Sequence, residues 1–280
     1  MDGVIVINKP KGMTSFDVVH EVSRFLEIKK VGHTGTLDPM AEGVLILCIG
    51  QATKIAELLT SYDKEYIAGV ELGIETDTYD IEGKVIETKE VKENLPIKEV
   101  LNSFKKTYLQ EVPIYSAVKV NGKKLYEYAR NNEKVELPKK EVTIKEIELL
   151  ENNNKTFKFK ASVTKGCYIR SLIHDIGQSL NTGATMTSLI RTKQGNTSIE
   201  ESCTLEEFKQ GNYKLKSIEE VLDMPVITVD KDLEFRIKNG QKLHNSFGVV
   251  DKVLFKGENN KLLGIYEVED THIKVWKNFS

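Results

Sequence analysis

The hydrophobic and polar positions of the chain follow several different periods, and each period predicts a type of element. Residues 3–7 and 44–49 are short, nearly continuous apolar runs, which are typical of buried strands. Apolar and polar residues alternate along residues 64–73, which predicts a strand with Tyr66 on its more apolar face. Alternation also predicts strands at residues 142–150 and 156–165, and a strand at residues 84–88 could form a hairpin.

Apolar residues spaced three or four positions apart predict helices in four segments. Ser15 is the expected N-cap of the first, because Val18, Val19 and Val22 follow it at helical spacing. The others are expected at residues 52–62, at residues 97–108 and from about residue 168 to residue 180. Strands and helices do not alternate strictly, which predicts an α+β fold built around a mixed β-sheet.

The pattern changes near Pro225. Beyond it we expect a short helix at residues 233–238, and strands at residues 226–229, 253–255, 262–268 and 273–276. A mostly β segment of about fifty residues is long enough to form a small domain. The sequence therefore predicts a larger domain of residues 1–225 and a small β-rich C-terminal domain of residues 226–280.

Composition places the chain among soluble globular proteins. Of its 280 residues, 40% are hydrophobic and 29% are charged. We find no apolar run of about eighteen residues, the length that would predict a membrane span, and no signal peptide before the first strand. We therefore expect a cytoplasmic protein that does not contact a membrane.

Metal and cofactor chemistry are not indicated by the sequence. The three cysteines lie far apart and form no CxxC pair, which argues against a disulfide framework and against a zinc site. The five histidines include no HxxxH pair, and neither a GxxxxGK[ST] motif nor a Rossmann glycine pattern is present. We expect neither a metal nor a nucleotide cofactor.

Charge is distributed unevenly although the net charge is only −2. Residues 119–145 contain eight Lys or Arg against four Glu, and Tyr126 and Tyr128 lie among them. Basic residues interleaved with aromatic ones are typical of a nucleic-acid interface, but a solvated helix face has the same pattern. Composition leaves both interpretations open.

The loop at residues 32–43, which precedes the strand at residues 44–49, combines glycines and threonines with one carboxylate, Asp38. Pro39 favours an extended conformation at Asp38. Asp38 could cap a short helix beginning at Pro39, or it could be a positioned nucleophile that needs no cofactor. An arginine such as Arg170 would hold this carboxylate ionised and oriented if the fold brought the two together.

Six segments resemble the motifs of the bacterial tRNA pseudouridine-55 synthases, the TruB family. The loop and the strand after it, residues 32–45, resemble the active-site motif of that family. The other segments occur in the same order as in the family: 8–15, 63–66, 115–122 with 126–130, 165–172 and 189–192. The resemblance spans residues 3 to about 195.

The resemblance implies an isomerase that converts uridine 55 in the T loop of tRNA to pseudouridine. Asp38 would be the nucleophile, attacking either C6 of the uracil or C1′ of the ribose. Tyr66 would stack on the flipped uracil and accept the C5 proton, although its periodicity alone is typical of a core residue. Arg170 would pair with Asp38. Because the target base must leave its stack, a loop is a better substrate than a duplex.

The remaining implied residues bind the substrate or support the site. His33 would fill or brace the space left by the flipped nucleotide, the alternative being an ordinary loop residue. Tyr168 would line the pocket, and Leu189 would form its apolar floor unless it is simply a core residue. Lys9 would support the site rather than touch the base.

The resemblance also implies partners. The segment at about residues 115–145 would be an RNA-gripping insertion that closes over the T arm, and residues 226–280 would form a PUA-like RNA-binding domain that reaches the acceptor stem. The protein would act as a monomer without a cofactor.

The alternative is a non-catalytic protein that binds or folds tRNA on the same scaffold, but such a protein would not need Asp38, Tyr66, Tyr168 and Arg170 together. A third possibility is a related synthase within a guided complex.

Overall fold

The computed structural model describes residues 1–279 and contains a nine-stranded mixed sheet. The strand order is β1-β3-β12-β4-β11-β10-β7, with β2 paired to β3 and β13 paired to β12. The strands are β1 (Gly3–Lys9), β2 (Val31–His33), β3 (Glu42–Ile49), β4 (Lys64–Leu72), β7 (Thr107–Glu111), β10 (Lys139–Asn153), β11 (Thr156–Val163), β12 (Ala184–Gln194) and β13 (Thr197–Ser198). Strand β12 pairs parallel to β3 and antiparallel to β4, so the predicted mixed α+β fold is confirmed.

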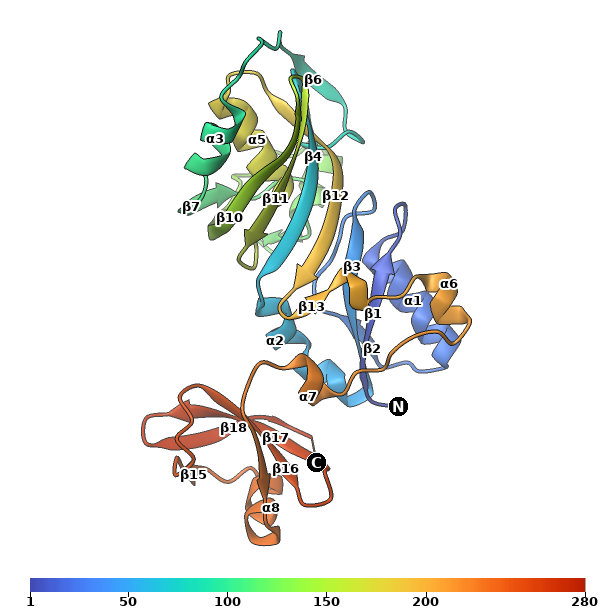
Figure 1. Ribbon diagram of the computed structural model, residues 1–280, viewed down its shortest axis with the longest axis vertical. Coiled ribbons are helices and arrows are strands. Elements are labelled where there is room, and N and C mark those ends of the chain that lie inside the picture. The colour runs from blue at the N-terminus through green and yellow to red at the C-terminus, as the bar shows by residue number, and fades with distance from the viewer. Residues whose placement is uncertain (280) are drawn as a thin grey trace.

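Two groups of helices cover different parts of the sheet, one over β4, β10, β11 and β12 and the other over β1 and β3 (Figure 1). Helices α3 (Ile97–Ser103) and α5 (Ile169–Ser179) share a core with β4, β10, β11 and β12. Helices α1 (Ser15–Leu26) and α6 (Leu205–Lys209) pack on β1 and β3. Residues of β1 and β3 contribute to cores on both faces, as their apolar sequences predict.

The structure corrects two predicted helices. The segment at residues 97–108 is helical only to Ser103, because Thr107 and Tyr108 join β7 and pair with β10. The segment at residues 52–62 is a 3₁₀ helix, η1 (Gly50–Ile55), followed by α2 (Ala56–Ser61).

The cap of the first helix is also one residue earlier than predicted. The Thr14 side chain accepts the backbone N–H of Asp17, so Thr14 is the N-cap. The Ser15 hydroxyl is buried instead and accepts the backbone N–H of Leu37, in the loop before β3. The start of α1 therefore fixes part of the Asp38 loop.

Strand β12 was not predicted, although it lies near the centre of the sheet. Its sequence mixes threonine, serine and charged residues with apolar ones, so neither a period of two nor a continuous apolar run is clear. The strand also carries two register shifts against β4, which disturb the alternation of its side chains.

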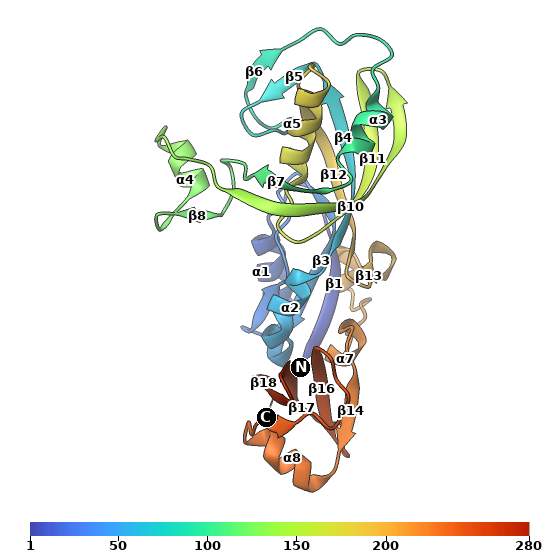
Figure 2. The same ribbon diagram turned by 90° about the vertical axis from the view of Figure 1, so that its left-hand side faces the viewer.

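The segment between β7 and β10 projects from the body of the molecule (Figure 2). It contains a small hairpin, β8 (Lys119–Val120) and β9 (Lys123–Lys124), and helix α4 (Leu125–Arg130). Pairing of Lys139 with Glu111 closes its base, so the last part of the predicted insertion at residues 115–145 belongs to β10. A second hairpin joins β5 (Ile74–Thr76) to β6 (Val85–Thr88), as predicted.

The C-terminal residues form a separate five-stranded sheet, in the order β14-β16-β17-β18-β15. It contains β14 (Val226–Val229), β15 (Leu243–His244), β16 (Lys252–Gly257), β17 (Leu262–Glu269), β18 (His272–Asn278) and helix α8 (Lys231–Lys238). The fold is β-rich and PUA-like, as expected, and α7 (Ile218–Val221) precedes it. No helix within residues 1–279 is long and apolar enough to cross a membrane.

Candidate active site

A cavity of about 560 Å³ opens where the loop before β3 meets β4, β12 and the start of α5. Five of the six predicted site residues line it: Asp38, Tyr66, Tyr168, Arg170 and Leu189. They come from four separate segments of the chain, so only the folded sheet brings them together. The sixth, His33, lies in β2 outside the lining of this cavity.

Asp38 lies in a loop without regular secondary structure, and no helix begins after it. The chain turns at Pro39 and Met40, where the backbone N–H of Ala41 donates to the Asp38 carbonyl oxygen at 3.0 Å, and it then enters β3 at Glu42. The helix-cap interpretation of Asp38 is therefore wrong. The side chain is 42% exposed, so the carboxylate is accessible from the cavity.

Lys9 supports this loop through hydrogen bonds to backbone oxygens. Its buried ammonium group donates to three carbonyl oxygens, those of Pro10, Met13 and Pro39, at 2.9, 2.7 and 3.3 Å. Burial lowers the pKa of Lys9 to about 8. Because its three donors point at backbone oxygens, Lys9 supports the residue next to Asp38 and is not among the residues that line the cavity.

Arg170 joins the Asp38 carboxylate to the body of the protein. Its Nε atom lies 3.0 Å from Asp38 Oδ2, and its Nη1 atom lies 3.4 Å from Asp80 Oδ2. Nη1 also donates to the Thr78 carbonyl oxygen and Nη2 donates to that of Tyr115, both at 3.1 Å. The guanidinium is only 7% exposed, so these contacts fix one orientation and present one edge to Asp38.

Asp80 was missed by the sequence reasoning. It lies in a turn between β5 and β6, and its side chain is 8% exposed. Its carboxylate also accepts the Thr78 hydroxyl at 2.7 Å and the backbone N–H of Glu82 at 3.1 Å. The turn-rich sequence around it carries no signal of a contact with a residue 90 positions away.

Tyr66 faces the cavity from β4 and lies beside Arg191 of β12 in the strand register. Burial raises the pKa of the Tyr66 phenol, and the charge of Arg191 offsets part of that rise. Arg191 is almost completely buried and donates from Nε to the Val44 carbonyl oxygen at 2.7 Å and from Nη2 to that of Gly35 at 3.1 Å. It therefore connects the loop, β3 and the Tyr66 side of the cavity, a role that the sequence did not reveal.

Tyr168 and Leu189 form other parts of the wall. Tyr168 is the extended N-cap residue of α5, with φ −102° and ψ 114°, and burial raises the pKa of its phenol. Leu189 lies in β12 and is 7% exposed. His33 accepts the backbone N–H of Gly35 on Nδ1 at 3.3 Å, and burial lowers its pKa, which favours the neutral ring. The role predicted for His33 toward a flipped nucleotide stays a prediction.

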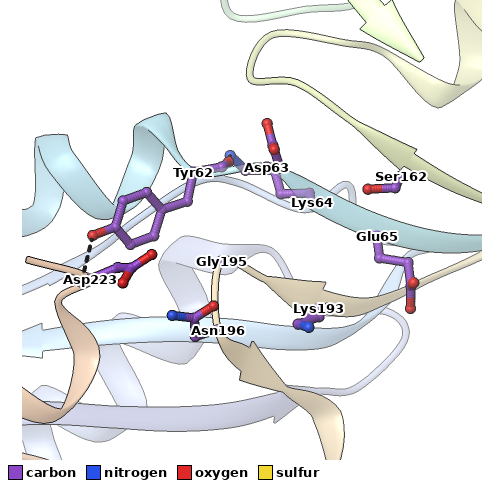
Figure 3. Close-up of a pocket in the computed structure, with 9 residues that line it drawn as sticks. All are labelled: Tyr62, Asp63, Lys64, Glu65, Ser162, Lys193, Gly195, Asn196 and Asp223. Atoms are coloured by element: carbon purple, nitrogen blue, oxygen red, sulfur yellow. Dashed lines mark hydrogen bonds between the residues drawn. The ribbon is translucent and has the colours of Figure 1, made fainter. Parts of the chain in front are cut away.

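A second cavity, of about 360 Å³, is drawn in Figure 3, and Lys64 lines both it and the first. Two of its three carboxylates, Asp63 and Glu65, form ion pairs with Lys145 and Lys160. The Tyr62 hydroxyl accepts the backbone N–H of Asp223 at 3.3 Å, as Figure 3 shows. These groups join the start of β4 to neighbouring segments of the protein. We therefore place the candidate site in the larger cavity, which the predicted site residues line.

Comparison with known proteins gives consistent results. The model described as "TruB family pseudouridylate synthase (N terminal domain)" matches residues 23–169, and "tRNA pseudouridylate synthase B C-terminal domain" matches residues 170–234. Proteins named tRNA pseudouridine synthase B from Fusobacterium nucleatum and Oceanobacillus iheyensis are 44% and 45% identical. The matches cover 98% of both chains for the first, and 97% of this chain and 94% of the relative for the second.

Solved structures share the fold. A structure titled "Structure of H/ACA RNP bound to a substrate RNA containing 2'-deoxyuridine" has a TM-score of 0.74 at 23% identity and covers 99% of this chain and 85% of that chain. A Cbf5-Nop10-Gar1 complex has a TM-score of 0.73 at 25% identity, with the same coverage.

Proposed function

The chain belongs to the TruB family of pseudouridylate synthases, and on that premise we propose that it is a tRNA pseudouridine synthase that isomerises uridine 55 in the T loop. The observation that carries the proposal is the ion pair between Arg170 and the partly exposed Asp38, at the edge of a cavity that Tyr66 and Tyr168 also line. The cavity volume of about 560 Å³ is within the usual range for a small-molecule or base pocket.

Asp38 is the nucleophile in this proposal. Arg170 holds it ionised and orients it, and the base reaches it only after leaving its stack. The carboxylate attacks C6 of the uracil or C1′ of the ribose, and the N1–C1′ bond breaks. The base turns and C5 bonds to C1′. On the C1′ route this step displaces the carboxylate from C1′, whereas on the C6 route the carboxylate leaves C6 as the C5 proton is lost. In both cases C5 loses its proton and N1 gains one. Because the product is an isomer of the substrate, no co-reactant is consumed.

Tyr66 covers the base and accepts the C5 proton. Because burial raises the pKa of its phenol, Tyr66 is protonated near neutral pH. It can therefore receive a proton on its oxygen only while it passes its own proton on. His33 and Tyr168 bind the flipped nucleotide, and Leu189 supports the base from the apolar side.

In this proposal, the T arm of the tRNA contacts the insertion between β7 and β10. Lys123 lies 4.7 Å from the centre of the Tyr128 ring, and Arg130 lies 5.3 Å from that of Tyr126. Arg130 is available for a phosphate beside the Tyr126 ring, whereas Lys123 also pairs with Glu133 at 2.6 Å and must leave that ion pair to contact one. The PUA-like domain at residues 226–280 extends the RNA contact toward the acceptor stem.

We further propose a monomer that acts in the cytoplasm. Asp38, Arg170, Tyr66 and Tyr168 of the same chain meet at one cavity, which supports the proposal of a monomer. The competing function, RNA binding without catalysis, is retained as an outcome of the test below.

The test is pseudouridine mapping on a T-arm stem-loop after incubation with the protein. We expect modification at position 55 alone, and a control stem-loop with cytidine at that position gives none. In Asp38→Asn the carboxamide keeps the shape of the side chain but loses its nucleophilicity, so the rate falls at least about 1,000-fold while stem-loop binding is retained. A wild-type protein that binds the stem-loop without modifying it supports the non-catalytic alternative, and wild-type activity in Asp38→Asn contradicts the assignment of the nucleophile.

A further inference from the structure

Gln110 is a buried polar residue that the chemistry above does not use. It lies in β7, and its side chain is 1% exposed. Its Oε1 atom accepts the backbone N–H of Tyr168 at 2.8 Å, and its Nε2 atom donates to the Tyr168 carbonyl oxygen at 3.1 Å. Nε2 also donates to the Tyr108 hydroxyl at 2.8 Å. Both amide hydrogens and the amide oxygen therefore have partners, and two of these three bonds go to Tyr168; the Gln110 side chain also contacts the Cys167 thiol.

The two bonds to Tyr168 require a particular backbone conformation. The N–H and C=O groups of one residue point to the same side only when that residue is extended, as in the hydrogen-bonded pairs of an antiparallel sheet. Tyr168 has this conformation, and α5 begins at the next residue. Tyr168 also has no side-chain cap bond of its own. Gln110 thus fixes the point at which the chain changes from extended to helical.

The position of this change from extended to helical backbone determines where two side chains of the site lie. The Tyr168 ring lines the cavity, and Arg170 follows two residues later with its Nε atom against Asp38. If the helix began one residue earlier, the Tyr168 ring would leave its place and the direction of Arg170 would change with it. From this geometry we propose that Gln110 is a positioning residue for the isomerisation, acting through Tyr168 and Arg170 on Asp38. The inference rests on the proposed function.

A neighbouring contact provides a comparison. The Ser171 hydroxyl donates to the Glu111 carbonyl oxygen at 2.9 Å, so a second bond already joins β7 to α5. That bond holds the two elements together but does not act on Tyr168. Within the Gln110 network, the Tyr108 hydroxyl leads away from the site, because it donates to Asp175 Oδ2 at 3.3 Å. Tyr108→Phe therefore removes part of the network and leaves both bonds to Tyr168.

The first experiment compares Gln110→Met with Tyr108→Phe in the full chain. Gln110→Met has a similar side-chain length but cannot bond the Tyr168 backbone. We expect its single-turnover rate on the T-arm stem-loop to fall about 10- to 100-fold, because small misplacements of reacting groups have effects of that size. The Kd for the stem-loop should change less than about threefold, and Tyr108→Phe should keep the wild-type rate within that same factor. Equal rates in the two variants overturn the inference.

A second variant separates positioning from a loss of folding. In Gln110→Glu, the protonated carboxyl can still accept from the Tyr168 N–H and donate to its C=O, whereas the ionised carboxylate cannot donate. Burial raises the pKa of the introduced carboxyl group. The ratio of the variant rate to the wild-type rate should therefore be highest at low pH and fall as pH rises through that pKa, with stem-loop binding constant. A ratio that does not depend on pH contradicts the inference. A wild-type chain that makes no pseudouridine contradicts the proposed function instead.

Discussion

At the scale of single residues, the phenol of Tyr66 has an environment that predicts its chemistry. It is 7% exposed, burial raises its pKa, and Arg191 lies beside it across β4 and β12. A ring in this position contributes apolar contact area, whereas its hydroxyl contributes only through proton transfer or a hydrogen bond. The two contributions can be separated by removing one atom.

Tyr66→Phe keeps the ring and removes the hydroxyl. We expect the single-turnover rate to fall at least about 100-fold, the usual contribution of a proton-transfer group, while the Kd for the T-arm stem-loop changes less than about threefold. Tyr62→Phe is the matched control, because the Tyr62 hydroxyl contacts the Asp223 backbone in the neighbouring cavity. Unchanged turnover in Tyr66→Phe would show that Tyr66 is not the proton acceptor.

The sequence predicts some of these residues and not others, for a physical reason. Asp38 and Arg170 lie in recognisable motifs, and the structure brings them within 3.0 Å. Asp38 by itself, however, has the local pattern of a helix cap, and only the turn at Pro39 and Met40 excludes that interpretation. The sequence did not predict a role for Asp80, because that role depends on its contact with the distant residue Arg170. Such a contact does not affect hydrophobic periodicity.

At the scale of elements, the loop that carries Asp38 depends on a close approach between β3 and β12. Gly43 pairs with Arg191 in the strand register and has a φ of +102°. A Cβ atom at this position would lie 2.2 Å from the Arg191 carbonyl oxygen. Because that neighbour is backbone, the clash can be relieved only by separating the strands.

Gly43→Ala should therefore lower the free energy of unfolding by about 2–5 kcal/mol, through backbone strain and overpacking together. Gly32→Ala is the matched control in the same loop region, because the nearest atom to its Cβ would be 3.9 Å away. We expect that control to change stability by less than about 1 kcal/mol. Denaturant unfolding of the three proteins measures the difference, and equal stabilities would contradict the argument.

Elements with one dominant period were predicted well, and elements defined by their partners were not. The strands at residues 44–49 and 64–73 and the helix near Tyr168 have clear patterns, and the structure has them within one or two residues. Strand β12 has a mixed pattern and exists because β3 and β4 lie on either side of it. The end of the helix at Ser103 is likewise set by the pairing of Thr107 and Tyr108 with β10.

At the scale of the whole molecule, the two sheets share a hydrophobic core. Val4 and Ile46 of the large sheet pack in one cluster with Leu254, Ile265 and Phe279 of the C-terminal part. Lys54 also donates to the Asn278 carbonyl oxygen at 2.6 Å. The C-terminal part has a core of its own as well, around Phe255 and Tyr266.

The change of sequence pattern near Pro225 predicts a new sheet, but it does not predict the shared core that forms the joint between the two parts. Apolar residues at 4 and 46 are equally consistent with burial under a helix of the same domain. Which surface covers them depends on the direction in which the chain leaves α7, and the local sequence does not encode that direction.

The shared core leads to a prediction about cooperativity that the sole tryptophan can report. Trp276 packs against the shared cluster, so its fluorescence follows the C-terminal part, whereas far-UV circular dichroism follows all of the chain. If the joint couples the two parts, both signals should change at the same denaturant concentration in the wild type.

Phe279→Ala removes a buried ring from the joint, at a cost of about 3–5 kcal/mol, and should move the Trp276 transition to a lower concentration than the main one. Phe235→Ala, at a position 66% exposed, should leave the two transitions together. A wild-type Trp276 transition that precedes the main one would mean that the core around Phe255 and Tyr266 unfolds independently, and that the joint contributes little to stability.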